Sequence, residues 1–219
     1  MKEIIINYIL AFLITIISSL IYNLLGFDNL DNFVNNYLVY ILLIYYVIMI
    51  IYLYKKNKRK ELKLKIKNYF GLIVLGISVA TIYNMIIFKF SPLTQTSSTP
   101  LYLLIMSTGI VGPILEEILF RYVFYNRLKK KYSKKTSIII NSTIFALVHL
   151  SPISINYAFI LGITLNLVYE KYKNIKAPIL VHIAGNIMVL FLHEYNSLVL
   201  IFSLINLIIS IYIIKQKDL

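Results

Sequence analysis

Cysteine is absent from the 219-residue chain, which excludes disulfides, thiolate metal sites and a cysteine nucleophile. Acidic residues are few: 9 Asp and Glu stand against 22 Lys and Arg, so the formal net charge is +13. The chain also lacks a polar segment long enough to fold as a separate soluble domain, because the longest one, 55–68, is a basic connector. We therefore expect one integral membrane domain over residues 1–219.

Apolar residues fill most of the chain. Hydrophobic types occupy 59% of positions, more than a soluble domain of this size could bury. A helix needs roughly 17–25 predominantly apolar residues to cross a bilayer. The sequence predicts an all-α, polytopic membrane bundle of eight transmembrane helices. Their expected ranges are 4–25, 37–54, 69–88, 101–124, 136–151, 155–170, 177–193 and 197–214.

The positive charge is distributed according to this topology. With eight crossings, every Lys and Arg except Lys89 falls on one side of the membrane. The positive-inside rule places that side, with both termini, in the cytoplasm. This distribution predicts the lipid bilayer, and not nucleic acid, as a partner. The abundance of Ile, Lys, Asn and Tyr indicates an AT-rich bacterial genome, and hence the cell membrane. The sequence makes no prediction of oligomeric state.

Ionisable groups inside apolar runs are the candidates for function. Each costs about 2.5–3.5 kcal/mol at the centre of a membrane helix, so it usually faces the bundle interior and serves a purpose. These groups are Glu116, Glu117, Arg121, His149, His182, His193 and Glu194. The last two close the seventh run, where we expect a solvated helix end.

The densest cluster lies after Gly112-Pro113, where the missing N–H of the proline predicts a helix kink just before the acids. Neighbouring helical residues point about 100° apart, so Glu116 and Glu117 make different contacts. Glu117 precedes Arg121 by four residues, the favourable order for a salt bridge. Glu116 is then left to act as a base. The alternative is that the three form a purely structural ion network.

Two further motifs carry histidine. His182 and Asn186 lie four apart, so they share one helix face and predict a polar pocket. Pro178 suits the first turn of their helix. His149 closes the fifth run, and simple counting puts it nearer the external surface than Glu116 and His182. The three reach one depth if residues 136–142 lie outside the hydrocarbon.

The residue set limits the chemistry. There is no His-Glu-x-x-His helix and no pair of intramembrane aspartates, and neither Ser107 nor Ser151 lies in a nucleophile-elbow pattern. Two acids, two histidines and an asparagine suit activation of water for attack on an amide, with donors for the resulting oxyanion. No cofactor is firmly implied, although the same Glu and His side chains could bind one divalent metal such as Zn²⁺.

Residues 101–190 contain three short motifs in this order: Glu116-Glu117-x-x-x-Arg121, Phe145-x-x-x-His149 and His182-x-x-x-Asn186. Together they resemble the three motifs of the CAAX-protease and bacteriocin-processing (CPBP, or Abi) family of intramembrane endopeptidases. The resemblance implies that Glu116 is the general base for water, assisted by His149, and that Glu117 and Arg121 support this geometry. It also implies that His182 and Asn186 bind the oxyanion.

The resemblance implies hydrolysis of a hydrophobic or membrane-associated peptide near the cytoplasmic face, in peptide maturation or bacteriocin self-immunity. Some family members have been called metalloproteases, but we expect a metal-independent glutamate mechanism. Bacteria of this kind generally lack CAAX prenylation, which favours a leader-bearing or signalling peptide as substrate. One alternative is a non-catalytic membrane immunity or interaction protein. Another is a transporter, which would need polar groups across the full membrane depth and not in three compact motifs.

Overall fold

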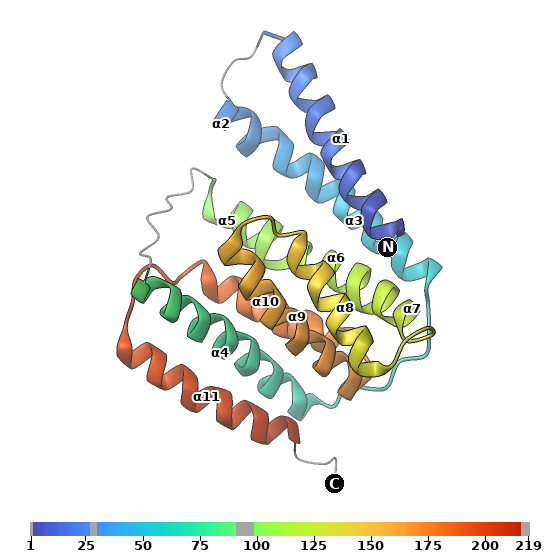
Figure 1. Ribbon diagram of the computed structural model, residues 1–219. Helices are drawn as coiled ribbons and strands as arrows, with labels where there is room; N and C mark the ends of the chain where they lie inside the picture. Colours follow the sequence, from blue (N-terminus) through green and yellow to red (C-terminus); the bar gives the residue numbers. More distant parts are fainter. Residues whose placement is uncertain (1, 27–29, 91–98, 216–219) are drawn as a thin grey trace.

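The computed structural model describes residues 2–26, 30–90 and 99–215, and all regular secondary structure in these ranges is helical. The α-helices are α1 (Lys2–Leu24), α2 (Leu30–Phe33), α3 (Val39–Lys56), α4 (Ile66–Phe90), α5 (Leu101–Leu104), α6 (Gly112–Glu117), α7 (Asn126–Leu128), α8 (Lys134–Leu147), α9 (Pro152–Tyr172), α10 (Lys176–Val189) and α11 (Ser197–Lys215). Three π-helical stretches join neighbouring pieces: η1 (Val34–Leu38), η2 (Ile105–Val111) and η3 (Ile118–Tyr125). The described residues thus form eight continuous helices (Figure 1), and the all-α prediction is confirmed.

Six of these helices are long and apolar enough to cross a membrane. The other two, α8 and α10, have 14 residues each. At 1.5 Å per residue each is about 21 Å long, shorter than a hydrocarbon core of about 30 Å. The predicted ranges 136–151 and 177–193 therefore extend too far, whereas 155–170 is too short, since α9 has 21 residues. Lys217, which the topology prediction assigns to the cytoplasmic side, lies outside the described residues.

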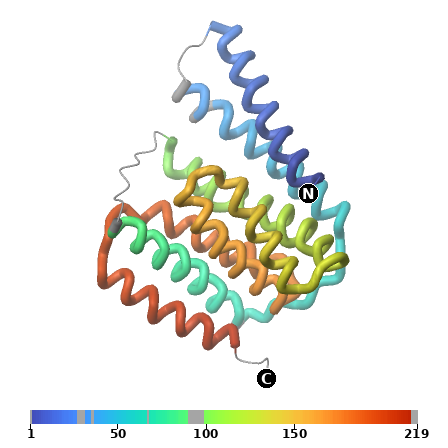
Figure 2. The backbone as a smooth tube through the Cα atoms, in the orientation of Figure 1, coloured from blue at the N-terminus to red at the C-terminus, as the bar shows by residue number. Residues whose placement is uncertain are grey.

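Helix α4 lies between α10 and α11, and the α8–α9 hairpin packs beside α10 (Figures 1 and 2). A hydrophobic core shared by α4, α9 and α10 includes Leu72, Leu165 and Val181, which are 0% exposed. In both views, α1 and α3 form a hairpin at the edge of the bundle. Apolar side chains of α1, α3 and α11 remain largely exposed, as expected of helices that face lipid.

The contact between α4 and α10 depends on a glycine. A Cβ atom at Gly76 would stand 2.1 Å from the backbone oxygen of Val181, so only glycine allows this approach. We expect Gly76→Ala to lower the stability of the protein by at least about 1–3 kcal/mol, because the backbone of α10 would have to shift. Thermal unfolding in detergent measures the effect. Gly71→Ala is the matched control, since its Cβ would meet side chains, those of Ile213 and Ile214, and not the backbone of another helix. Equal melting temperatures would contradict this packing.

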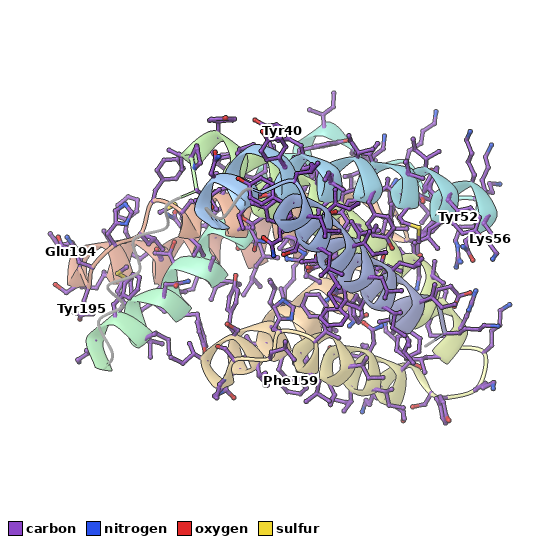
Figure 3. All side chains as sticks on the ribbon, turned by 90° about the horizontal axis from the view of Figure 1, so that it is seen from above. Tyr40, Tyr52, Lys56, Phe159, Glu194 and Tyr195 are labelled. Carbon is purple, nitrogen blue, oxygen red and sulfur yellow. The ribbon has the colours of Figure 1, made fainter. Side chains whose placement is uncertain are left out.

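The two ends of the bundle differ in charge. Figure 3 shows Lys56 at one end and Glu194 at the other. Lys89, which the topology prediction separates from the other basic residues, has its amino group 5.9 Å from the ring centre of Tyr195, beside Glu194. The structure therefore separates Lys89 from Lys56 by the length of the bundle, and the number and orientation of the membrane crossings stay predictions.

Candidate active site

The helix that carries the two acids changes its hydrogen-bond pattern on both sides of them. The π-helical stretch η2 ends at Val111, where the Gly112 N–H donates to the carbonyl of Ser107, five residues earlier. Helix α6 then holds Glu116 and Glu117, and η3 follows directly. Such π-helical turns are rare and often occur at functional sites. The helix thus changes its hydrogen-bond register just before Pro113, and the predicted kink stays a prediction.

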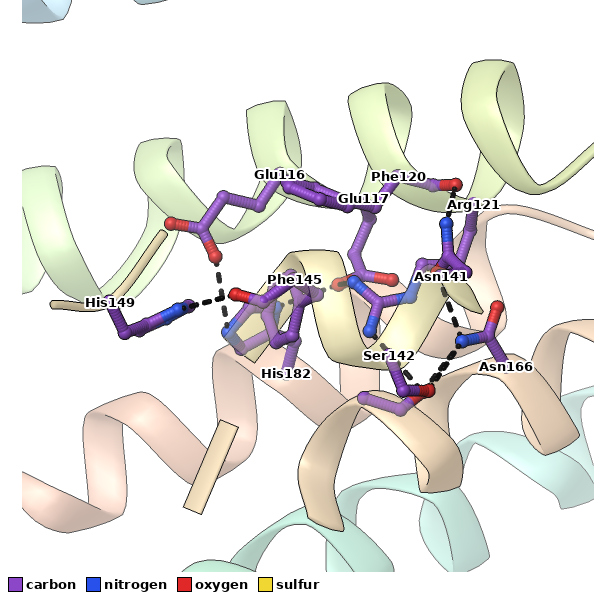
Figure 4. A network of polar contacts seen from close by, with 11 residues as sticks. Glu116, Glu117, Phe120, Arg121, Asn141, Ser142, Phe145, His149, Asn166 and His182 are labelled. Atoms are coloured by element: carbon purple, nitrogen blue, oxygen red, sulfur yellow. Dashed lines mark hydrogen bonds and ion pairs between the residues drawn. The ribbon is translucent and has the colours of Figure 1, made fainter. Parts of the chain in front are cut away.

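Glu117 is completely buried and forms the centre of an ion network (Figure 4). Its Oε1 atom accepts hydrogen bonds from Arg121 Nη1 and from His182 Nδ1, each at 2.8 Å. Arg121 is 0% exposed and His182 is 2% exposed. The predicted salt bridge between Glu117 and Arg121 is therefore confirmed, and His182 on α10 is its third member.

Arg121 is enclosed by aromatic rings as well as by charge. Its guanidinium carbon lies 4.2 Å from the ring centre of Phe145 on α8, a cation–π distance. Its Nη2 atom also approaches the carbonyl of Gly162 on α9 at 3.4 Å. One arginine thus connects the acid-bearing helix to both members of the α8–α9 hairpin.

Glu116 has a different environment. Its side chain is 27% exposed, and its Oε2 atom lies 3.8 Å from Nε2 of His182. That separation is too long for a hydrogen bond and leaves the carboxylate free to act on another group. Adjacent acids in one helical turn therefore diverge as predicted, one into the buried network and one toward open space.

The open space is a cavity of about 330 Å³ between three elements. Helix α3 supplies an apolar wall that ends in Tyr46, and the opposite wall contains Ser107, Thr108 and Glu116. Asn186 on α10 completes the lining, and its Nδ2 donates to the Thr108 carbonyl at 2.9 Å. The cavity therefore brings together the acid of the first motif and the asparagine of the third.

His149 lies in the turn after α8 and not within the helix, because α8 ends at Leu147. Its Nδ1–H donates to the Phe145 carbonyl at 2.8 Å, which leaves Nε2 as an acceptor. The Phe145 ring centre lies 4.9 Å from that of His149 and 5.9 Å from that of His182. Leu150 follows with φ 61°, a strained conformation for a bulky residue.

The two histidines thus flank one aromatic ring, and Figure 4 shows them with Glu116 at one end of the polar network. The ring distances place the two histidines together whatever the position of residues 136–142 in a membrane. Within that segment, Asn141 and Ser142 are buried inside the protein. The membrane depth of that segment stays a prediction.

Sequence reasoning missed a second polar cluster beneath this network. Asn166 on α9 donates to Asn141 Oδ1, Ser142 Oγ and the Gly162 carbonyl at 2.8–3.1 Å. Asn141 in turn donates to the Phe120 carbonyl at 2.9 Å. Asn166 stands within a predicted membrane run, so its polarity was an available signal. The cluster fixes α8 and α9 against the helix that carries the acids.

The remaining candidates have structural partners. Ser107 donates to the Leu103 carbonyl at 2.6 Å, and Ser151 caps α9 by accepting from the Ser154 N–H at 3.2 Å. His193 and Glu194 are exposed after the end of α10, as expected of a solvated helix end. Across residues 2–26, 30–90 and 99–215, no three His, Asp or Glu side chains are placed to hold a metal ion. Arg121 and His182 share Oε1 of Glu117, so this oxygen is not free for a metal.

The division between the two acids leads to an accessibility prediction. The chain has no native cysteine, so a single introduced thiol is labelled without background. We expect Glu116→Cys to react with a small polar methanethiosulfonate in the folded protein, because position 116 lines the cavity. Leu115→Cys is the control, since Leu115 is 3% exposed and should react only after unfolding. Equal reactivity at both positions would contradict the cavity.

Fold and site together define a polytopic membrane protein in which carboxylate and histidine side chains meet beside a cavity. Residues 98–188 match the family model described as type II CAAX prenyl endopeptidase Rce1-like. The motif-bearing part of the chain is therefore similar to this CAAX-protease family, the resemblance that its three motifs indicate.

Three curated proteins are similar to the chain. The putative membrane peptidase YdiL of Bacillus subtilis is 36% identical over 87 residues, covering 40% of this chain and 36% of YdiL. The membrane-embedded CAAX protease MroQ of Staphylococcus aureus is 29% identical over 184 residues, covering 73% of this chain and 69% of MroQ. The UPF0177 protein YbdI of Lactococcus lactis is 23% identical over 136 residues, covering 56% of this chain and 74% of YbdI. The chain thus spans only about a third of YdiL, and no solved structure matches it.

Proposed function

We propose that the chain is an intramembrane endopeptidase that hydrolyses a peptide bond by water activated at Glu116. One observation carries the proposal: Glu116 lines a cavity and is 27% exposed, whereas Glu117, directly beside it, is 0% exposed and already paired with Arg121 and His182. A general base must reach the proton that it removes, so Glu116 suits the role and Glu117 does not. Glu117 and Arg121 are then positioning residues that orient His182.

In the proposed reaction, Glu116 removes one proton from water as the water oxygen attacks the scissile carbonyl carbon. His149 assists through Nε2, which accepts a proton in the neutral ring whose Nδ1–H donates to the Phe145 carbonyl. The tetrahedral intermediate then collapses, the C–N bond breaks, and the proton held by Glu116 passes to the leaving amine. The products are a carboxylate and an amine, and no metal takes part.

The negative oxygen of the intermediate needs hydrogen-bond donors. His182 Nδ1 donates to Glu117, so in the proposal the ring carries a proton on both nitrogens when Nε2 donates to the oxyanion. Nε2 faces the Glu116 carboxylate at 3.8 Å, so a group bound between them lies within reach of both. Asn186 uses one N–H for the Thr108 carbonyl, and an amide has a second N–H to offer. Donors held in place before the reaction stabilise an oxyanion at little reorganisation cost.

The apolar wall of α3 supports a hydrophobic or membrane-associated peptide as substrate, because Val39, Leu42 and Leu43 line the cavity opposite Glu116. Its volume of about 330 Å³ lies at the lower end of typical ligand sites, roughly 300–1,000 Å³. We propose eight crossings with both termini in the cytoplasm, which places cleavage near the cytoplasmic face. Maturation of a leader-bearing peptide and bacteriocin self-immunity are the roles that fit this chemistry.

Cleavage of a fluorogenic membrane-peptide library by the purified full chain tests the activity. We expect hydrolysis that resists a chelator, and that persists in Ser107→Ala, because neither a metal nor a serine nucleophile is required. Loss of activity with chelator would contradict the glutamate mechanism in favour of a metal. Loss in Ser107→Ala, at an unchanged melting temperature, would favour a serine nucleophile. A folded protein that cleaves no peptide would favour a non-catalytic immunity or interaction role.

A further inference from the structure

A second concave surface lies away from the candidate active site, where the acid-bearing helix meets α8. We call it the basic groove. It has a volume of about 660 Å³ and is lined by Phe124, Arg127, Leu128, Lys130, Lys131, Tyr132, Ile140 and Ile144. None of these residues is acidic, and none belongs to the three motifs. The groove is therefore a separate feature that the peptidase chemistry does not use.

The cations of the groove differ from their neighbours in how they are paired. Lys129 is bound to Glu170, an acid that it shares with Lys173 and Lys134. Lys130 and Lys131 have no acidic partner among the described residues. Arg127 pairs with Glu3 on α1, and its side chain is still 45% exposed. The rim thus keeps at least two uncompensated positive charges.

The floor of the groove has the opposite character. Phe124 and Leu128 are 6% and 8% exposed, and they face Ile140 and Ile144 of α8 across the groove. The candidate span Leu101–Leu128 ends where the lysines begin, so the rim stands at the depth of lipid headgroups and the floor lies along the acyl chains. Tyr132, 49% exposed at the rim, adds a phenol suited to this boundary.

We propose that the basic groove binds one anionic phospholipid, with its phosphate at Lys130 and Lys131 and an acyl chain along Phe124 and Ile144. Charge complementarity selects the headgroup, and the apolar floor requires a chain attached to it. One wall of the groove belongs to the helix that carries Glu116, and the other to α8, which ends just before His149. A lipid bound in the groove contacts both helices, so it binds only the folded protein. Any ligand that binds only the native state raises the stability of that state.

The test compares phosphatidylglycerol with phosphatidylcholine, added to the full chain in neutral detergent, by melting temperature and by native mass spectrometry. We expect phosphatidylglycerol to raise the melting temperature more. The double variant Lys130→Gln/Lys131→Gln should weaken its binding about fivefold for each lysine, and so roughly 30-fold for both. Lys58→Gln/Lys60→Gln is the matched control, because it removes the same charge from two exposed positions outside the groove.

Three results would overturn the proposal. An equal loss of phosphatidylglycerol binding in both double variants would mean that only the overall surface charge attracts the lipid. Equal stabilisation by phosphatidylcholine would mean that the groove does not recognise the negative charge of the headgroup. Stabilisation by soluble glycerol phosphate at the same concentration would identify a site for free phosphate, with no role for the apolar floor. All four exchanged lysines are exposed, so these variants should fold normally.

Discussion

Arg121→Met is expected to destabilise the folded protein by about 3–5 kcal/mol, the usual cost of removing one partner from a buried ion pair. Both side chains of the Glu117–Arg121 pair are 0% exposed, so no water can replace the lost partner. The variant would also lose the cation–π contact with Phe145, which links the acid-bearing helix to α8. Thermal or denaturant unfolding in neutral detergent, without anionic lipid, measures the change.

The control for this prediction is Arg127→Met, which breaks an ion pair with Glu3 that is 45% exposed on the arginine side. Exposed pairs contribute at most about 1 kcal/mol, so its effect should be small. The double variant Glu117→Leu/Arg121→Met should recover most of the lost stability, because no unpaired charge remains buried. If Arg121→Met were as stable as Arg127→Met, the buried network would not hold these helices together.

Glu116→Gln is expected to reduce peptide hydrolysis by about 10²–10⁴-fold, the usual contribution of a general base. Glutamine has almost the same size and shape, and among the described residues the one ionic partner of the carboxylate is His182, at 3.8 Å. The side chain is also 27% exposed, so the melting temperature should change little. Initial rates and thermal unfolding on the same preparation separate the two effects.

Glu117→Gln is the informative comparison, because the neighbouring acid is fully buried. It weakens two hydrogen bonds, to Arg121 and to His182, and should therefore lower both the rate and the melting temperature. If Glu116→Gln also lowered both, then Glu116 would be a structural member of the ion network and the proposed base would be wrong.

Helical spacing was sufficient to predict how the two acids divide their roles. Glu117 and Arg121 are four residues apart, and this alone predicts the pair seen at 2.8 Å. The same spacing placed His182 and Asn186 on one face, and both lie near Glu116. Helical spacing predicts such pairs well in this chain, because an apolar helix offers a charged side chain few polar partners other than one a single turn away.

Contacts between distant segments could not be predicted in this way. Tyr46 and the apolar wall of α3 precede Glu116 by about 70 residues, and nothing in that run marks its cavity-facing side. The position of His149 was also missed, because Ser151 and Pro152 start α9 and thereby end α8 earlier than hydropathy suggests. A search for ionisable groups could not identify Asn166, because it is a neutral amide, and its Nδ2 donates to three buried acceptors.

The most direct test is the initial rate of peptide-bond hydrolysis by the folded wild-type and Glu116→Gln proteins, with the products identified by mass spectrometry. We expect the wild-type chain to release a new carboxylate and a new amine. The variant should do so at least about 100 times more slowly at the same melting temperature. Equal rates in the two proteins would contradict the central role of Glu116.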